Sequence, residues 1–442
     1  MTSPAPRGSR PARLRALLRR LRAAVREPEL RPAAAPPPPR PWLEERVRER
    51  IRVGLRPSVV RDHRLNLLVP SIRSDVVFGG VQTALDLFEA VGTLSARRRI
   101  VTLGPLDAAI AGRLPDYRVS RGDEDPDEPR MLVSIGDDDA TLAVGPGDVF
   151  IATFWSTAEL ALRIGPWQVE TFGASPGRLG YLIQDYEPGF YPWSTNYLLA
   201  LATYRPAIPT VAIFNTALLR AYFHESGLSF AHEFAFEPRL PGALRAALAR
   251  RPEGPRHRRI VIYGRPRTPR NAFPLLVEAL RAWRAREPEG SDWSVVSVGQ
   301  AHPDVDLGGG AVLKSLGKLD LDAYGTLLHE SAIGLSFMIS PHPSYPPLEM
   351  AHFGMLVLTN RFAAKDLSTW HTNIRSLDDV SIGGVADALA GLCRLVESDP
   401  GLGDRGVSAV RDYLSDAPQF PFAVEVAELL HPDGAPRADV RA

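Results

Sequence analysis

Residues 259–271 read RIVIYGRPRTPRN, a short apolar run followed at once by a glycine, two prolines and three arginines. A short apolar run bounded by turn residues is typical of a buried β-strand. A helical pattern follows over residues 273–283, so the segment predicts a strand, a loop and a helix. Ligands of α/β sheets bind at the carboxyl ends of parallel strands, which is where this loop would place its arginines.

Apolar runs alternate with helix-length segments on both sides of residues 259–271. Because parallel strands are usually joined by a crossover helix, this rhythm predicts the α/β class, with doubly wound parallel sheets. The rhythm runs once before the basic segment 251–258 and again after it, which indicates two Rossmann-like domains. Strands are expected at 65–69, 99–103, 149–153, 181–184, 210–214, 259–263, 293–298, 332–337 and 355–359, and helices at 81–91, 273–283 and 321–329.

The length of 442 residues suits two domains with terminal segments. We expect a disordered, basic and Pro-rich tail at 1–41, a first Rossmann-like domain at 42–235 and a second one at 236–405. The remaining residues, 406–442, are expected to form a helix and a tail, with the helix packed back on the first domain. Ligand is expected in the cleft between the two sheets.

The composition excludes several classes of protein. The 52 Lys and Arg residues nearly cancel the 51 Asp and Glu residues, so no net field favours nucleic acid. The single cysteine, Cys393, excludes a disulfide framework and a Cys-based zinc site, and it fits a reducing compartment. No apolar run approaches the roughly 18 residues that span a bilayer. We therefore expect a cytoplasmic protein.

The N-terminal tail carries an amphipathic pattern. Leu14, Leu17, Leu18, Leu21 and Val25 share one helical face, and arginines cover much of the rest. Such a segment can rest on anionic lipid at the inner membrane surface. A solvated, disordered tail is an equally good interpretation, because basic amphipathic stretches are weakly specific.

Two glycines mark the first strand-to-helix junction. The chain has neither the G-x-G-x-x-G nor the G-x-x-x-x-G-K-[ST] pattern, which argues against a dinucleotide oxidoreductase and a P-loop NTPase. Gly79 and Gly80 would instead let the backbone approach a ligand, with the next helix aiming its N-terminal amides at an anion. Glycines at such junctions are more often simple turn residues.

Arg265 and Arg270 follow the strand predicted at 259–263. Guanidinium groups match phosphate oxygens bidentately and neutralise a diphosphate without a metal ion. Arginine is common in this chain, whereas lysine occurs at three positions only, and Lys314 is the first of them. A rare lysine is a candidate for a site that requires a compact charge.

Residues 340–354 read SPHPSYPPLEMAHFG, between two predicted strands. Two adjacent prolines, Pro346 and Pro347, fit the start of a helix, which puts Glu349 in its first turn. The carboxylate can complement the helix dipole. It also stands at the ligand end of a sheet, where a carboxylate can accept hydrogen bonds from a ribose hydroxyl.

Asp185 ends the strand predicted at 181–184 and begins an aromatic stretch that includes Tyr186, Phe190 and Trp193. Aromatic faces beside a carboxylate suit a carbohydrate acceptor, whose ring stacks while its hydroxyls form hydrogen bonds. From the pattern alone, a core-packed aromatic helix with an Asp cap is equally compatible. The acidic triplet at 137–139 is interpreted as a solvated loop rather than a metal site.

These segments resemble a known family. Arg265 with Arg270, Leu316 with Gly317, and Glu349 before residues 350–354 resemble the donor domain of glycosyltransferase family 4. Segments 78–80, 183–188, 342–349 and 365–368 look more closely like the WsaF-type rhamnosyltransferases. The resemblance covers about residues 64–400, which includes both predicted domains.

The resemblance implies a GT-B fold, with an acceptor-side first domain and a nucleotide-sugar-binding second domain. It implies a dTDP-L-rhamnose donor, a growing glycan as acceptor, either free or lipid-linked, no cofactor or essential metal, and retention of anomeric configuration. Arg265 and Arg270 would hold the diphosphate and Glu349 the nucleoside sugar. The same resemblance places Leu316, Gly317 and Tyr345 in the donor site.

One departure from the family pattern concerns Pro341, where the first Glu of an E-x7-E motif would stand. Contacts with the transferred sugar must therefore differ, and His342 and Ser344 are the candidates for them. In the predicted mechanism Arg265 and Arg270, with Lys314 and the glycine turn, stabilise the departing nucleotide, and Asp185 orients or deprotonates the acceptor hydroxyl. A catalytically silent glycan-binding scaffold and a nucleotide-sugar epimerase remain alternatives.

Overall fold

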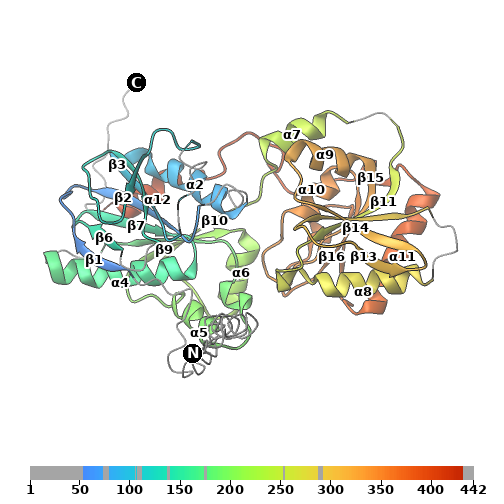
Figure 1. The fold of residues 1–442 in the computed structure, drawn as a ribbon, viewed down its shortest axis with the longest axis horizontal. Helices are drawn as coiled ribbons and strands as arrows, with labels where there is room; N and C mark the ends of the chain where they lie inside the picture. The colour runs from blue at the N-terminus through green and yellow to red at the C-terminus, as the bar shows by residue number, and fades with distance from the viewer. Residues whose placement is uncertain are drawn as a thin grey trace, which may run out of the picture. The chain divides into compact units, whose positions relative to one another are not determined.

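A computed structural model describes residues 53–72, 79–104, 106, 112–136, 140–173, 177–251, 254–286 and 292–431. Within them the chain forms two α/β lobes, each built on one large sheet, which confirms the predicted α/β class with two Rossmann-like domains (Figure 1). The predictions for the tail at 1–41, for Phe78 and for the acidic triplet at 137–139 lie outside the described residues.

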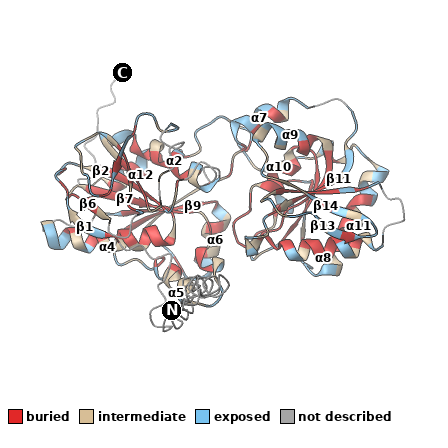
Figure 2. Cartoon of the chain, in the orientation of Figure 1, coloured by how far each residue is buried: buried red, intermediate tan, exposed pale blue. Residues whose placement is uncertain are grey.

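The N-terminal lobe contains an eight-stranded sheet in the order β10-β9-β8-β7-β2-β3-β5-β4, with every pairing parallel. All residues of the central strands β2, β7, β8 and β9 are buried, as expected for a sheet with helices on both faces (Figure 2). The strands are β2 (Arg64–Val69), β3 (Arg97–Thr102), β4 (Arg118–Arg121), β5 (Arg130–Ser134), β7 (Asp148–Ala152), β8 (Leu179–Ile183), β9 (Thr210–Asn215) and β10 (His232–Phe236).

The helices of this lobe are α2 (Gly80–Val91), α4 (Trp155–Phe172), α5 (Thr195–Ala202) and α6 (Ala217–Glu225), with a small parallel pair of strands, β1 (Gly54–Pro57) and β6 (Thr141–Val144). Near the end of the described chain, α12 (Ala423–Leu430) packs against α2. Phe420, Val426 and Leu430 share a buried core with Leu67 and Leu87.

The C-terminal lobe contains a seven-stranded sheet in the order β13-β14-β12-β11-β15-β16-β17, with the single antiparallel pairing β13–β14 at its edge. The strands are β11 (His257–Gly264), β12 (Ser294–Gly299), β13 (Val305–Gly308), β14 (Ala311–Gly317), β15 (Ser331–Leu335), β16 (Leu356–Asn360) and β17 (Ile374–Leu377). Helices α8 (Phe273–Arg284) and α11 (Ile382–Ser398) cover one face, and α7 (Gly242–Ala249), α9 (Leu321–Glu330) and α10 (Pro346–His352) cover the other (Figure 1).

Apolar residues at helical spacing explain how α8 packs on its sheet. Phe273, Leu276, Val277 and Leu280 recur at positions i, i+3, i+4 and i+7, and all four are buried. They form one apolar stripe that faces the sheet. The loop before α8 thereby holds Arg270 at the carboxyl end of β11.

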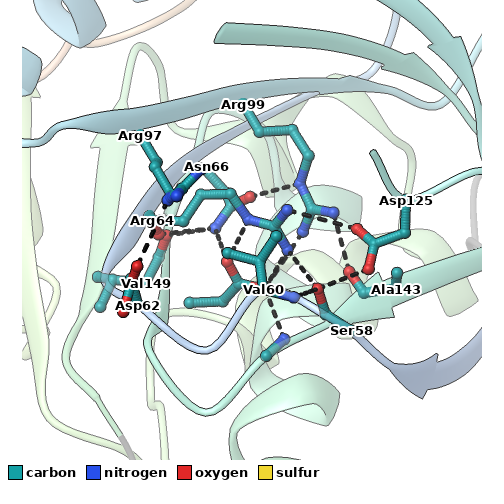
Figure 3. Close-up of polar contacts among 12 residues, drawn as sticks. Ser58, Val60, Asp62, Arg64, Asn66, Arg97, Arg99, Asp125, Ala143 and Val149 are labelled. Carbon is teal, nitrogen blue, oxygen red and sulfur yellow. Dashed lines mark hydrogen bonds and ion pairs between the residues drawn. The ribbon is translucent and has the colours of Figure 1, made fainter. Parts of the chain in front are cut away.

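Buried ion pairs tie the amino ends of the N-terminal strands together (Figure 3). Arg64 at the start of β2 contacts Asp148 at the start of β7 through Nε at 2.6 Å and Nη2 at 2.8 Å. Arg99 Nη2 lies 3.4 Å from the same carboxylate, and its Nε donates to Asn66 Oδ1 at 2.6 Å. Burial alone would raise the pKa of Asp148, but the two guanidiniums outweigh burial and the pKa is lowered. This network lies at the opposite end of the strands from the site described next.

Candidate active site

Asp185 stands at the carboxyl end of β8 and contacts two residues of the C-terminal lobe. Asp185 is 5% exposed, and its Oδ1 accepts hydrogen bonds from Tyr186 N at 2.8 Å and from Ser340 Oγ. Its Oδ2 lies 3.6 Å from Nε of Arg270. The predicted acceptor-side carboxylate and the predicted diphosphate-binding arginine are therefore brought into direct contact.

Arg270 is held in place by its backbone and its aromatic neighbour. Its carbonyl accepts from Ile339 N at 2.7 Å, and its guanidinium carbon lies 4.1 Å from the ring centroid of Phe190. A guanidinium over an aromatic face is stabilised electrostatically. Its Nε is buried and has no hydrogen-bond partner among the described residues, and burial lowers the Arg270 pKa. The side chain is thus fixed between the Phe190 ring and the Asp185 carboxylate.

The loop between β15 and α10 supplies the next group of polar side chains. His342 and Ser344 are buried, and Ser344 adopts φ 67°, a left-handed conformation that is strained for a residue with a Cβ. Ser344 N donates to His342 Nδ1 at 3.0 Å. Tyr345 contacts the N-terminal lobe, because its hydroxyl accepts from Nδ2 of Asn215 at 2.8 Å. Strain of this kind is commonly found where a site must keep a fixed geometry.

Lys365 is a buried cation in the same cluster. It is 1% exposed, and its Nζ donates to the Met338 carbonyl at 2.5 Å. Burial lowers its pKa to about 7, while the charge of Asp185 opposes that shift. An ammonium group is strongly hydrated, so holding it in this environment lowers the stability of the fold.

Replacing Lys365 by methionine is expected to stabilise the protein. Because the folded pKa lies below the ordinary value of 10.5, unfolding takes up a proton between about pH 7 and 10.5, and wild-type stability rises with pH through that window. Near pH 7 the variant should gain about 2–4 kcal/mol in the free energy of unfolding. Urea unfolding at pH 7 and pH 10 measures this gain, which should shrink at the higher pH. A variant that is less stable at pH 7 would contradict it.

Glu349 lies in the first turn of α10, as predicted, and is partly buried. Its Oε2 accepts from the Tyr324 hydroxyl at 3.0 Å. Burial raises the Glu349 pKa to about 7, and the bond from Tyr324 opposes that rise. The carboxyl group is therefore poised to change its charge near neutral pH.

The other predicted site residues lie around this cluster. Gly79 adopts φ 62° just before α2, and a Cβ on Gly80 would come within 2.8 Å of the Gln184 side chain at the end of β8. The Gln184 side chain therefore lies against the start of α2. Arg265 is exposed in the same loop as Arg270, and Gly317 ends β14 with φ 63°. The remaining two lie on β14: Leu316 stands near its end, and Lys314 is exposed within it.

Sequence reasoning did not assign site roles to Ser340, Lys365, Tyr324 or Asn215. Ser340 and Lys365 lie in segments 340–354 and 365–368, where burial rather than residue type sets them apart. Tyr324 reaches Glu349 from α9, and Asn215 reaches Tyr345 from β9. Such contacts depend on tertiary packing, so no local pattern could have indicated them.

Within the ranges that the structure describes, no three His, Cys, Asp or Glu side chains gather into a group that could hold a metal ion. In the same residues, no helix has the length and apolar character needed to cross a membrane.

Comparisons with known proteins identify the family. Models for the N-terminal and C-terminal domains of WsaF match residues 64–217 and 258–390, more than half of the chain together. The O-antigen biosynthesis protein RfbC of Myxococcus xanthus is 35% identical over 213 residues, which are 48% of this chain and 15% of that protein. This chain therefore spans a small part of that relative.

Two solved structures are similar to this chain, and WaaG is the one that shows the fold. WaaG, a glycosyltransferase involved in lipopolysaccharide biosynthesis, matches with a TM-score of 0.51 and 12% identity over 83% of this chain and 99% of its own. Sucrose-phosphate synthase from Thermosynechococcus elongatus matches with a TM-score of 0.48 and 14% identity over 84% and 95%. At these identities the likeness concerns the fold alone.

Proposed function

Because the chain belongs to the WsaF family of glycosyltransferases and has the GT-B fold, we propose that it transfers L-rhamnose from dTDP-L-rhamnose to a growing polysaccharide. The contact of Asp185 with Arg270 and Ser340 is the observation that carries the proposal. It puts a carboxylate from one sheet beside a cation and a hydroxyl from the other. A donor diphosphate and an acceptor hydroxyl require this combination of charges at one place.

The proposed chemistry is a retaining transfer that needs no metal ion. The bond from the sugar C1 to the phosphate oxygen breaks, and a bond from C1 to the acceptor oxygen forms. Arg270, helped by Arg265, stabilises the negative charge on the departing dTDP. The departing phosphate takes the acceptor proton, and Asp185 orients the acceptor hydroxyl.

A ligand panel tests the donor. The melting temperature of the purified protein is measured in EDTA with dTDP-, UDP- or GDP-linked sugars. In a separate experiment, unheated protein is assayed in EDTA for transfer from the same sugars to polysaccharide fragments. Ligand at about 100 Kd adds about 2.7 kcal/mol, so the melting temperature should rise visibly. A rise with dTDP-L-rhamnose and transfer in EDTA support the proposal. A response to UDP or GDP sugars alone would contradict the donor, and transfer that requires a divalent cation would contradict the metal-free mechanism.

Donor binding is expected to strengthen with rising pH through the Glu349 pKa of about 7. A ribose hydroxyl donates best to an ionised carboxylate, so the nucleotide sugar should bind about five- to tenfold more weakly at pH 6 than at pH 8. Titration calorimetry in buffers of different ionisation enthalpy should also detect proton release on binding. Glu349→Gln is the matched control and should show neither the tighter binding at pH 8 nor the proton release. A wild-type affinity that does not change with pH would contradict this role.

A further inference from the structure

His342 carries a hydrogen-bond donor that nothing in the described protein accepts. The side chain is 7% exposed, and its Nε2 is buried without a partner among the described residues. Buried polar groups in native proteins are nearly always hydrogen-bonded, so an unmatched one in a site requires an explanation.

The tautomer of His342 follows from its neighbours. Ser344 N donates to Nδ1 at 3.0 Å, so Nδ1 has no proton and the hydrogen of the neutral ring is on Nε2. Burial lowers the His342 pKa to about 4, and Lys365 and Arg270 act in the same direction while Asp185 opposes them. The ring therefore stays neutral at physiological pH and donates from Nε2.

The ring is also fixed in position. Its own backbone N donates to Ser340 Oγ at 3.1 Å, and that hydroxyl donates in turn to Asp185. The Tyr345 ring meets its edge with centroids 5.4 Å apart. The strained backbone of Ser344 aims the amide that holds Nδ1. These contacts preorganise the imidazole but leave Nε2 unused.

The surrounding charges indicate which kind of ligand atom would accept from Nε2. Asp185 is the acceptor of the cluster, and a neutral N–H is a donor without charge. A hydroxyl oxygen is an uncharged acceptor that suits an uncharged N–H, whereas a phosphate oxygen is an anion that gains more from a charged guanidinium such as that of Arg270.

We propose that His342 Nε2 donates to a hydroxyl of the transferred sugar and so helps the enzyme to select that sugar. This inference rests on the proposed function. The loop that carries His342 leads directly into α10 and Glu349, the residue proposed to hold the nucleoside. His342 is thus a specificity residue on the donor side, and it contributes nothing to binding of the nucleoside diphosphate itself.

Titration calorimetry on the full chain tests this assignment. The ligands are dTDP, UDP and GDP, each compared with a sugar nucleotide that carries the same diphosphate. His342→Phe should lose about tenfold in affinity for the sugar nucleotide that the wild type binds, with unchanged affinity for the diphosphate. His342→Gln, whose amide can place an N–H near the position of Nε2, should recover most of the loss. His352→Phe is the matched control, because its Nε2 is also buried without a partner among the described residues while its ring packs on Tyr413.

Each other outcome overturns the assignment. Equal losses of affinity for the diphosphate and the sugar nucleotide would show a phosphate contact. In the transfer assay with polysaccharide fragments, a change in acceptor KM alone would show an acceptor contact. Undiminished sugar-nucleotide affinity in His342→Phe would show no ligand contact at all. Failure of the wild type to bind any member of the panel would overturn both this inference and the proposed function.

Discussion

Replacing Arg270 by alanine should lower kcat for glycosyl transfer about 10²- to 10³-fold, because one preorganised donor to a developing oxyanion typically contributes that much. The side chain is held for this task by the Phe190 ring, by the Ile339 amide on its carbonyl and by the Asp185 carboxylate. Its buried Nε has no hydrogen-bond partner in the described chain. In the proposed mechanism the guanidinium donates to the departing phosphate through its terminal nitrogens.

The matched control for this variant is Arg267→Ala in the same loop. Arg267 is exposed, and its described hydrogen bond comes from the backbone N to Gln300 Oε1, so removing the side chain should leave kcat within about twofold. Arg270→Lys keeps the charge but loses the planar fork and should recover only part of the rate. Initial-rate kinetics at saturating donor measure all three variants. An Arg270→Ala protein with more than a tenth of wild-type kcat would exclude the proposed role.

Much of the fold could be predicted from local patterns. The run 259–263 lies within β11, and the helix expected at 273–283 is α8 with one more residue. Buried parallel strands are short and continuously apolar, so such runs are easy to find. Edge strands such as β4 and β13 were not predicted, because their partly exposed residues alternate with charged and glycine residues.

The positions of candidate-site residues could be predicted where these residues come directly after the carboxyl end of a strand. Asp185, Arg270 and Glu349 each stand at the carboxyl end of a strand or in the next helix, and the structure places all three there. Which of them touch one another depends on contacts between lobes, for which one sequence carries no signal. The neutral state of His342 likewise depends on burial and on the Ser344 amide, and not on residue type.

Replacing Asp148 by asparagine should lower the free energy of unfolding by about 3–5 kcal/mol, because Arg64 and Arg99 would keep their buried charges with one anion fewer. Asp62→Asn is the control. Asp62 is 80% exposed and lies 3.7 Å from Arg97, so its loss should change stability by less than about 1 kcal/mol. Urea unfolding followed by tryptophan fluorescence compares the two variants.

The pH dependence separates a charge effect from a packing effect in Asp148→Asn. The folded pKa of Asp148 lies below the ordinary 3.8, so its contribution is complete above that value and is lost as pH falls through the folded pKa. The deficit of the variant should therefore be constant from pH 5 to 8 and shrink in stronger acid. A loss below 1 kcal/mol at neutral pH would mean that the network stabilises little.

The folded Asp148→Asn variant should keep wild-type kcat, because Asp148 starts β7 whereas Asp185 follows the carboxyl end of β8. A large loss of kcat would show that both ends of the sheet control the site.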